Sequence, residues 1–93
     1  MRINWDDSKS EKLKRERGLS LEEASEIISR PGAVTDQKSD DPEQFYAIGF
    51  VKDRLITLIF ETREDADGEF TWLVTYWKAT KSETEIYERE KGR

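Results

Sequence analysis

The sequence of 93 residues contains neither cysteine nor histidine, and both absences limit the chemistry it can perform. Without cysteine there is no disulfide bond and no thiolate metal site. Without histidine the chain lacks the commonest metal ligand and the usual proton carrier near neutral pH. We therefore do not expect a zinc enzyme or a hydrolase with a cysteine–histidine or serine–histidine–aspartate site, and we expect neither a metal nor another cofactor.

Long apolar segments are missing as well. The longest apolar run, from Leu55 to Phe60, is interrupted by Thr57 and is far too short to cross a membrane. The first seven residues show no apolar core of a signal peptide, so we expect a cytoplasmic protein without a membrane anchor. A chain of this length forms one domain, over residues 1–93, with a thin core to which three Trp, three Tyr and four Phe contribute.

Charge is abundant but unevenly distributed. The formal net charge is −5, which alone is unfavourable for binding nucleic acid. Residues 9–17, however, carry five basic and two acidic side chains. Residues 36–44 carry four acidic side chains and one basic side chain. Residues 61–69 carry five acidic side chains and one basic side chain. The positive charge is thus concentrated on one segment, and the negative charge falls mainly in segments that we expect to be loops.

Capping residues and apolar spacing predict three helices. Each expected helix begins at a residue that can accept a hydrogen bond from the first turn. We expect these helices over Ser8–Arg17 with Gly18 as the stop, from a capping box of Ser20 and Glu23 to a stop at Arg30-Pro31-Gly32, and after a second capping box of Thr80 and Glu83.

Three segments rich in β-branched and aromatic residues predict strands joined by short turns, which favours an antiparallel meander. Residues 36–44 are expected to be an acidic loop, and Gly49 a β-bulge. The sequence therefore predicts an α+β fold with an antiparallel sheet of three to four strands, two N-terminal helices and a C-terminal helix. The strands are expected over Phe45–Val51, Leu55–Glu61 and Phe70–Trp77, after a short extended start at Ile3–Trp5.

Four short segments are more specific than this order of elements. They are Trp5-Asp6-Asp7 with Lys9, Arg17-Gly18 with Ser20–Ala24, Asp53-Arg54-Leu55, and Lys78-Ala79-Thr80 with Glu83 and Tyr87. In this order they resemble the Trp-Asp-x-x-Lys opening, the Lys-His-Gly turn with its Ser-x-Glu-Glu-Ala helix, the Gly-Arg-Leu hairpin and the closing Arg-Lys-Ala-Thr segment of BrnT-type toxins. The resemblance covers nearly the whole chain.

The resemblance implies a RelE-like fold and a ribosome-independent ribonuclease toxin. It also implies a ribbon-helix-helix antitoxin that neutralises the toxin. The chain departs from the family pattern at four of its basic positions. Glu16 and Arg17 stand where the family has Lys and His, and Gln44 and Trp77 stand where it has two Arg.

Cleavage of RNA through its 2′-hydroxyl needs groups that accept and donate a proton, and cations for the phosphate. We predict Arg17, Arg54 and Lys78 as the cations and Glu43 as the base. Each has an ordinary alternative. Arg17 suits the C-terminal end of a helix, Arg54 a solvated turn, and Lys78 the end of a strand. Glu43 would alternatively be a solvated charge in the acidic loop.

The basic helix is a second candidate surface. Lys9, Lys12 and Lys14 would contact RNA phosphates on one interpretation. On the other, they belong to a solvated helix of mixed charge, or to a docking surface for an acidic partner.

Aromatic residues of the last expected strand offer a third candidate. Phe70, Trp72 and Tyr76 are expected to share one face of the strand and to be core residues. Trp77 falls on the other face and is the aromatic predicted to contact RNA.

Two main hypotheses follow. The chain is either the ribonuclease toxin of a type II toxin–antitoxin module, or a catalytically degenerate toxin-like module that binds protein without cleaving RNA. A small RNA-binding domain without toxicity is a third. The cognate antitoxin and RNA are the expected partners, and the oligomeric state is left open by these patterns.

Overall fold

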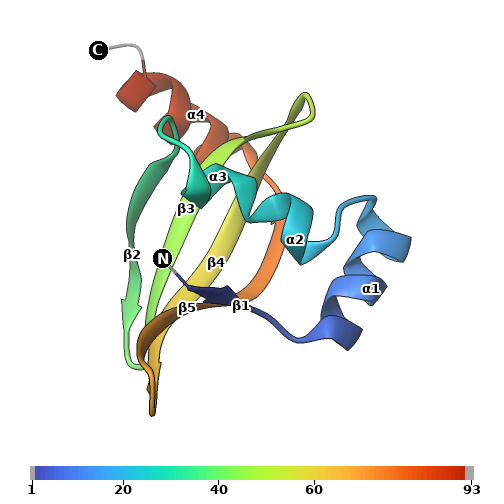
Figure 1. Cartoon of the computed structure of the whole chain (residues 1–93). Coiled ribbons are helices and arrows are strands. Elements are labelled where there is room, and N and C mark those ends of the chain that lie inside the picture. Colours follow the sequence, from blue (N-terminus) through green and yellow to red (C-terminus); the bar gives the residue numbers. More distant parts are fainter. Residues whose placement is uncertain (1, 92–93) are drawn as a thin grey trace.

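The computed structural model describes residues 2–91 and shows an α+β fold built on one mixed sheet (Figure 1). Within these residues five strands lie in the order β1-β5-β4-β3-β2. β1 runs parallel to β5, and the other neighbours are antiparallel. The elements are β1 (Ile3–Asn4), α1 (Asp7–Arg17), α2 (Leu21–Ala24), α3 (Glu26–Ser29), β2 (Val34–Asp40), β3 (Glu43–Val51), β4 (Arg54–Asp65), β5 (Gly68–Lys78) and α4 (Lys81–Lys91).

The expected antiparallel sheet of three to four strands is therefore wrong in strand number and in the direction of β1. Most of the expected acidic loop, residues 36–44, belongs to β2 and to the start of β3. β2 is an edge strand with mostly exposed side chains, so it shows no alternation of apolar residues. Charged side chains are common on such edges because they discourage pairing with other chains.

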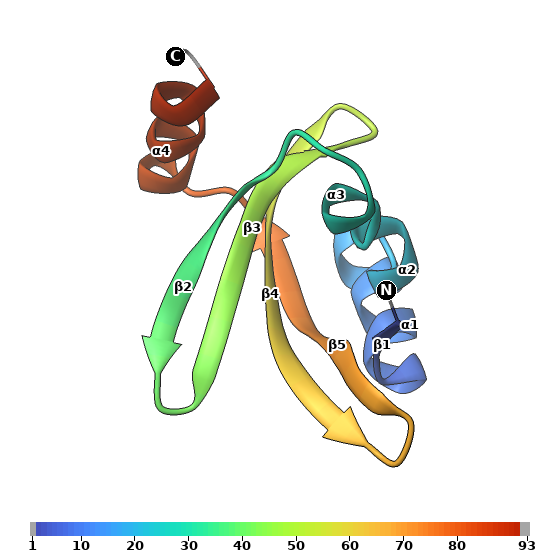
Figure 2. The ribbon, with the colours of Figure 1, turned by 60° about the vertical axis from the view of Figure 1, so that its left-hand side comes forward.

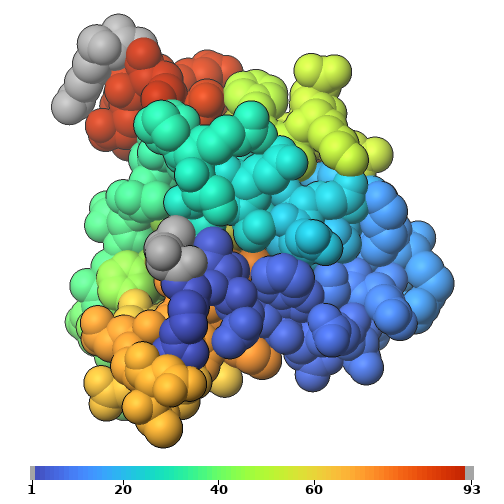
Figure 3. Space-filling view, in the orientation of Figure 1, coloured from blue at the N-terminus to red at the C-terminus, as the bar shows by residue number. Residues whose placement is uncertain are grey.

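Helices cover both faces of the sheet. Figure 2 shows α1, α2 and α3 on one side of the sheet and α4 on the other. In Figure 3 the first three helices close over their face of the sheet, and the β3–β4 hairpin stands above them. The main core lies on this side, around Leu13, Leu21, Leu58 and Tyr76. No helix within residues 2–91 is long and apolar enough to cross a membrane.

The second expected helix is divided at Ser25 into α2 and α3. The Ser25 hydroxyl donates a hydrogen bond to the backbone carbonyl of Glu22 at 2.6 Å. A serine that bonds to a neighbouring carbonyl in this way competes with regular helical hydrogen bonding. The two short helices still bury Leu21 and Ile27 against the sheet.

An irregularity in β5 changes which aromatic residues share a face. Between the pairs Ile59–Thr75 and Phe60–Leu73, β5 has one extra residue, Val74. Because side chains alternate along a strand, this bulge places Phe70 and Trp72 on the face of Trp77 and opposite Tyr76. The expectation that these two residues are core partners of Tyr76 is therefore wrong. The main core contains Tyr76 but neither Phe70 nor Trp72.

Gly49 is not a bulge, because it pairs with Ile56 in a regular ladder. A β-carbon at Gly49 would lie 3.2 Å from the β-carbon of Ile27. The glycine therefore allows α3 to approach β3 closely.

Tyr76 connects the sheet to the segment between α1 and α2. Its side chain is 2% exposed, and burial raises the pKa of its hydroxyl. The hydroxyl donates to the Leu19 carbonyl at 2.7 Å and accepts from the Leu19 N–H at 3.0 Å. Both backbone groups of Leu19 thus depend on this one side chain.

Replacing Tyr76 by Phe should lower the free energy of unfolding by about 2 kcal/mol, because two buried backbone groups lose their partner. Urea denaturation of the variant and the parent protein measures this difference. Tyr87→Phe is the matched control, because within residues 2–91 no hydrogen bond is formed by the Tyr87 hydroxyl. We expect its stability to change by less than about 0.5 kcal/mol. Equal losses in the two variants would contradict the role given to Tyr76.

Candidate functional site

Helix α1 ends at the site, and its caps explain where it begins and stops. Asp6 accepts a hydrogen bond from the Lys9 N–H at 2.9 Å at the first turn. At the other end Gly18 adopts a left-handed conformation, with φ of 93°, and its N–H donates to the Lys14 carbonyl at 3.0 Å. The predicted stop at Gly18 is confirmed. Arg17, the last residue of the helix, is thereby placed beside the end of β5.

A pocket of about 710 Å³ lies between the end of α1, the β3–β4 hairpin and the link from β5 to α4. It brings together the three predicted cations and Trp77, which come from three separate parts of the chain. Its lining consists of Arg17 from α1, Phe50, Asp53, Arg54, Leu55 and Ile56 from the hairpin, Tyr76, Trp77 and Lys78 from β5, and Ala79 and Thr84.

Another hollow, of about 580 Å³, lies beyond α3 and suits anionic ligands less well. Phe45 and Phe60 form part of its wall, with ring centroids 5.6 Å apart. Its charged lining residues are Arg30 and Asp36, one of each sign. The pocket at the end of α1 carries three cations and one carboxylate, Asp53, and is therefore the better candidate for an anionic ligand.

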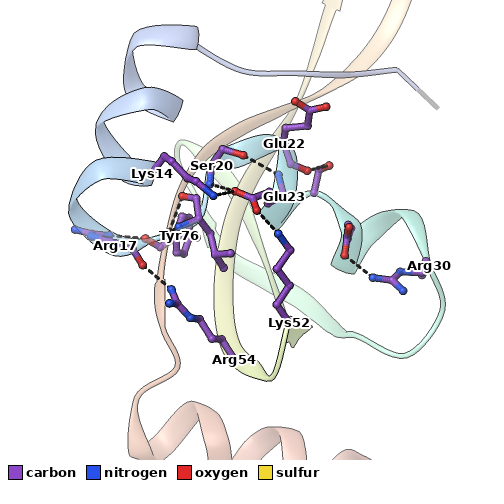
Figure 4. Close-up of polar contacts among 12 residues, drawn as sticks. Lys14, Arg17, Ser20, Glu22, Glu23, Arg30, Lys52, Arg54 and Tyr76 are labelled. Atoms are coloured by element: carbon purple, nitrogen blue, oxygen red, sulfur yellow. Dashed lines mark hydrogen bonds and ion pairs between the residues drawn. The ribbon is translucent and has the colours of Figure 1, made fainter.

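Arg17 and Arg54 are held in place by backbone carbonyls (Figure 4). The Arg17 guanidinium donates to the carbonyl of Tyr76, and Arg54 Nη1 donates to the carbonyl of Arg17 at 2.7 Å. Within residues 2–91 each guanidinium makes one such hydrogen bond. A guanidinium has five N–H donors, so both side chains keep donors for a ligand.

Gly18 is required for the position of Arg54 as well as for the helix end. A β-carbon at Gly18 would lie 2.5 Å from Arg54 Nη1, which is closer than atoms can approach. Any side chain at this position would therefore displace the Arg54 guanidinium.

Of the three cations of the pocket, Lys78 is the one whose side chain makes the fewest polar contacts within the described part of the protein. It is exposed at the end of β5, and within the described residues its side chain forms no hydrogen bond or ion pair. The other two pocket cations each contact a backbone carbonyl. Lys78 is thus the cation that is most available to an external phosphate.

Trp77 is anchored within the protein rather than free to stack. Its indole N–H donates to Glu83 Oε1 at 3.0 Å, and the Thr57 hydroxyl donates to the same oxygen at 2.9 Å. The Thr80 N–H also donates there at 2.8 Å, which confirms the predicted capping box. Burial raises the pKa of Glu83, but these hydrogen bonds outweigh it and the net pKa is lowered. Trp77 therefore lines the pocket with an indole whose orientation is fixed.

Glu43, the predicted base, does not line this pocket, so the structure does not bring it together with the three predicted cations. It begins β3, whereas Phe50 near the other end of the strand lines the pocket. The seven intervening steps span roughly 23 Å at about 3.3 Å per residue. The carboxylate of the pocket is Asp53, in the turn between β3 and β4. Asp53 was not predicted as a site residue, because the Asp53-Arg54-Leu55 segment was singled out as a hairpin and not for its carboxylate.

Most of the basic helix also lies outside the pocket. Lys9 and Lys12 are exposed and do not line it. Lys14 is paired with Glu23, at 2.7 Å between Nζ and Oε1. Of the helix α1 cations, only Arg17 lines the pocket.

Glu23 joins α1, α2 and the β3–β4 hairpin (Figure 4). Its carboxylate accepts hydrogen bonds from Lys14 of α1, from Lys52 of the hairpin, and from the Ser20 N–H at 2.9 Å. The predicted capping box of Ser20 and Glu23 is confirmed. The hydrogen bonds from Lys14 and Lys52 are the main reason that the pKa of Glu23 is strongly lowered.

Glu23→Gln should lower the free energy of unfolding at neutral pH by about 1–2 kcal/mol, because a helix cap and two ion pairs are weakened. The folded state lowers the pKa of Glu23, so its stabilisation is present above the ordinary carboxyl pKa and is lost as pH falls. The difference between variant and parent should therefore shrink from about pH 7 to about pH 3, as measured by urea denaturation. Glu22→Gln, one residue away on the exposed surface, is the matched control. A pH-independent difference would contradict this account.

With this geometry established, comparison with known families gives one match. Residues 5–83 match a family model described as the ribonuclease toxin, BrnT, of type II toxin–antitoxin systems. The matched range contains every lining residue of the pocket except Thr84. Comparison with curated proteins finds no match.

Proposed function

Since this chain belongs to the BrnT family of ribonuclease toxins of type II toxin–antitoxin systems, we propose that it cleaves RNA in the pocket at the end of α1. The observation that carries the proposal is the gathering of Arg17, Arg54 and Lys78 around one volume. Fixed cations next to a phosphate stabilise the extra negative charge that develops as it reacts. The same membership motivates our proposal that the fold is RelE-like and the working compartment the cytoplasm.

The proposed reaction is an internal phosphoryl transfer. The 2′-hydroxyl oxygen of a nucleotide forms a bond to the adjacent phosphorus, and the bond to the 5′-oxygen breaks. Lys78 and Arg54 neutralise the non-bridging oxygens, and water returns a proton to the departing 5′-oxygen. The products are a 2′,3′-cyclic phosphate and a 5′-hydroxyl end.

Asp53 takes the role of proton acceptor that was first given to Glu43. It is the only carboxylate among the lining residues of the pocket in the described chain. The turn that carries it consists of Lys52 and Asp53, with φ of 49° and 68°. Aspartate tolerates this left-handed conformation better than most residues, so the turn can present a carboxylate to the 2′-hydroxyl.

The family also implies an antitoxin partner, and we propose that it is of the ribbon-helix-helix type. An antitoxin that covers the pocket would neutralise the three cations and exclude RNA from them.

The proposal is tested by incubating the purified protein with a single-stranded RNA and with the all-deoxy oligonucleotide of the same sequence. We expect cleavage of the RNA alone, with 2′,3′-cyclic phosphate ends that mass spectrometry identifies. Activity should persist through repeated purification and in the presence of a chelator. Intact RNA, together with tight binding of the antitoxin, would instead support the degenerate module.

One observation favours that second candidate. Gln44 and Trp77, which stand where the family has arginine, are both engaged internally. Gln44 donates to Glu61 at 2.8 Å, and Trp77 donates to Glu83 at 3.0 Å. Two positions of the family pattern thus supply no charge here, and any cleavage depends on the remaining cations of the pocket.

A further inference from the structure

We propose that Phe50 is the platform on which a base of the bound RNA stacks, so that the pocket takes single-stranded RNA with an unpaired base beside the reacting phosphate. This inference rests on the proposed function and adds the form of RNA that the site accepts. It assigns a role to the open surface of a residue that is only partly packed within the chain.

Phe50 is unusually exposed for its type. It is 55% exposed, and within residues 2–91 it is the only large hydrophobic residue that is largely open to solvent. The last register pair between β2 and β3 joins Val34 to Ile48, so no strand covers Phe50 on that side. Single exposed apolar residues are common on protein surfaces, and exposure alone therefore does not identify a site.

The setting of Phe50 provides the second observation. Its ring meets the edge of the Tyr87 ring, with centroids 5.6 Å apart and planes at 81°. Its cross-strand partner is Leu55, which also lines the pocket. The ring is thus supported by Tyr87 and Leu55 while more than half of the residue stays open to solvent.

The charged groups of the surrounding pocket indicate which kind of ligand would bind against the exposed face of Phe50. Phe50 lines the same pocket as Arg17, Arg54 and Lys78. A nucleotide combines a flat aromatic base with an anionic phosphate, and sites for single strands combine aromatic faces with cations in the same way. A base within a duplex is stacked on its neighbours and cannot offer its face to a side chain. The combination of these groups therefore favours an unpaired nucleotide over a duplex.

The test uses two short oligonucleotides that carry 2′-O-methyl groups and cannot be cleaved through the 2′-hydroxyl. One is intact and the other lacks a single base at its centre. We expect the parent protein to bind the intact oligonucleotide about 5- to 150-fold more tightly, the usual range for one stacked base. Phe50→Leu keeps apolar bulk and should abolish this discrimination, whereas Phe50→Trp should retain it. A 2-aminopurine at the same position should be quenched on binding to the parent protein but not to Phe50→Leu.

Trp72→Leu is the matched control, because Trp72 lies near β1 and packs against Arg63 with 4.6 Å between the guanidinium carbon and the ring centroid. It should leave the discrimination unchanged. If the parent protein binds both oligonucleotides with equal affinity and Lys78→Gln lowers the affinity for both, the stacking proposal is overturned. The proposed phosphate site is then supported. Phe50 would then be better assigned to a protein contact. If neither oligonucleotide binds the parent protein, this inference and the proposed function both fail.

Discussion

Cleavage of RNA should fall by about two to four orders of magnitude when Asp53 is replaced by asparagine. Asparagine has nearly the same shape and tolerates the left-handed conformation that Asp53 adopts, with φ of 68°. The turn should therefore persist while the group that we propose as the acceptor of the 2′-hydroxyl proton is lost. Single-turnover cleavage of a labelled RNA measures this step without a contribution from product release.

Asp67→Asn is the matched control for Asp53→Asn. Asp67 lies in the turn between β4 and β5 and does not line the pocket. Its replacement should leave the cleavage rate within about twofold of the parent, since surface changes of this kind have small effects. If Asp53→Asn cleaves as fast as Asp67→Asn, another group accepts the proton.

Lys78→Gln should reduce cleavage by about 100- to 1,000-fold, which is the usual cost of removing one group that stabilises the developing charge. The side chain is exposed and has no protein partner within the described residues, so the variant should unfold at the same urea concentration as the parent. Measuring kcat/KM and the urea midpoint of unfolding for both proteins distinguishes a loss of catalysis from a loss of stability.

Lys81→Gln controls for the general loss of one positive charge. Lys81 begins α4, three residues beyond Lys78, and does not line the pocket. We expect cleavage by this variant to stay close to that of the parent. Equal losses in the two lysine variants would indicate a diffuse electrostatic effect in place of a defined phosphate contact.

The parts of the fold that were predicted from the sequence are those with local causes. Gly18 ends α1, and the capping boxes at Ser20 and Thr80 begin helices, because each signal involves residues three or four positions apart. β2 was missed because an exposed edge strand needs no apolar face. The parallel pairing of Ile3 with Thr71 joins distant segments, and no local pattern reveals such a contact.

The site was predicted in part for a similar reason. Arg17, Arg54 and Lys78 lie at the ends of recognisable elements, and these ends meet at one end of the sheet. Glu43 lies apart from these residues, because a segment expected to be a loop says little about which end of the sheet it occupies. Phe50 was overlooked because a strand pattern shows that a residue is apolar, but not that the neighbouring strand ends before reaching it.

Two hydrogen bonds hold the β3–β4 hairpin in place, one on each side of Asp53. Lys52 is held by Glu23, and Arg54 is held by the carbonyl at the end of α1. Asp53 lies between them, so the proposed proton acceptor is preorganised before any RNA arrives. Little conformational entropy should be lost on association, and the hairpin should keep the same arrangement in the free and bound states.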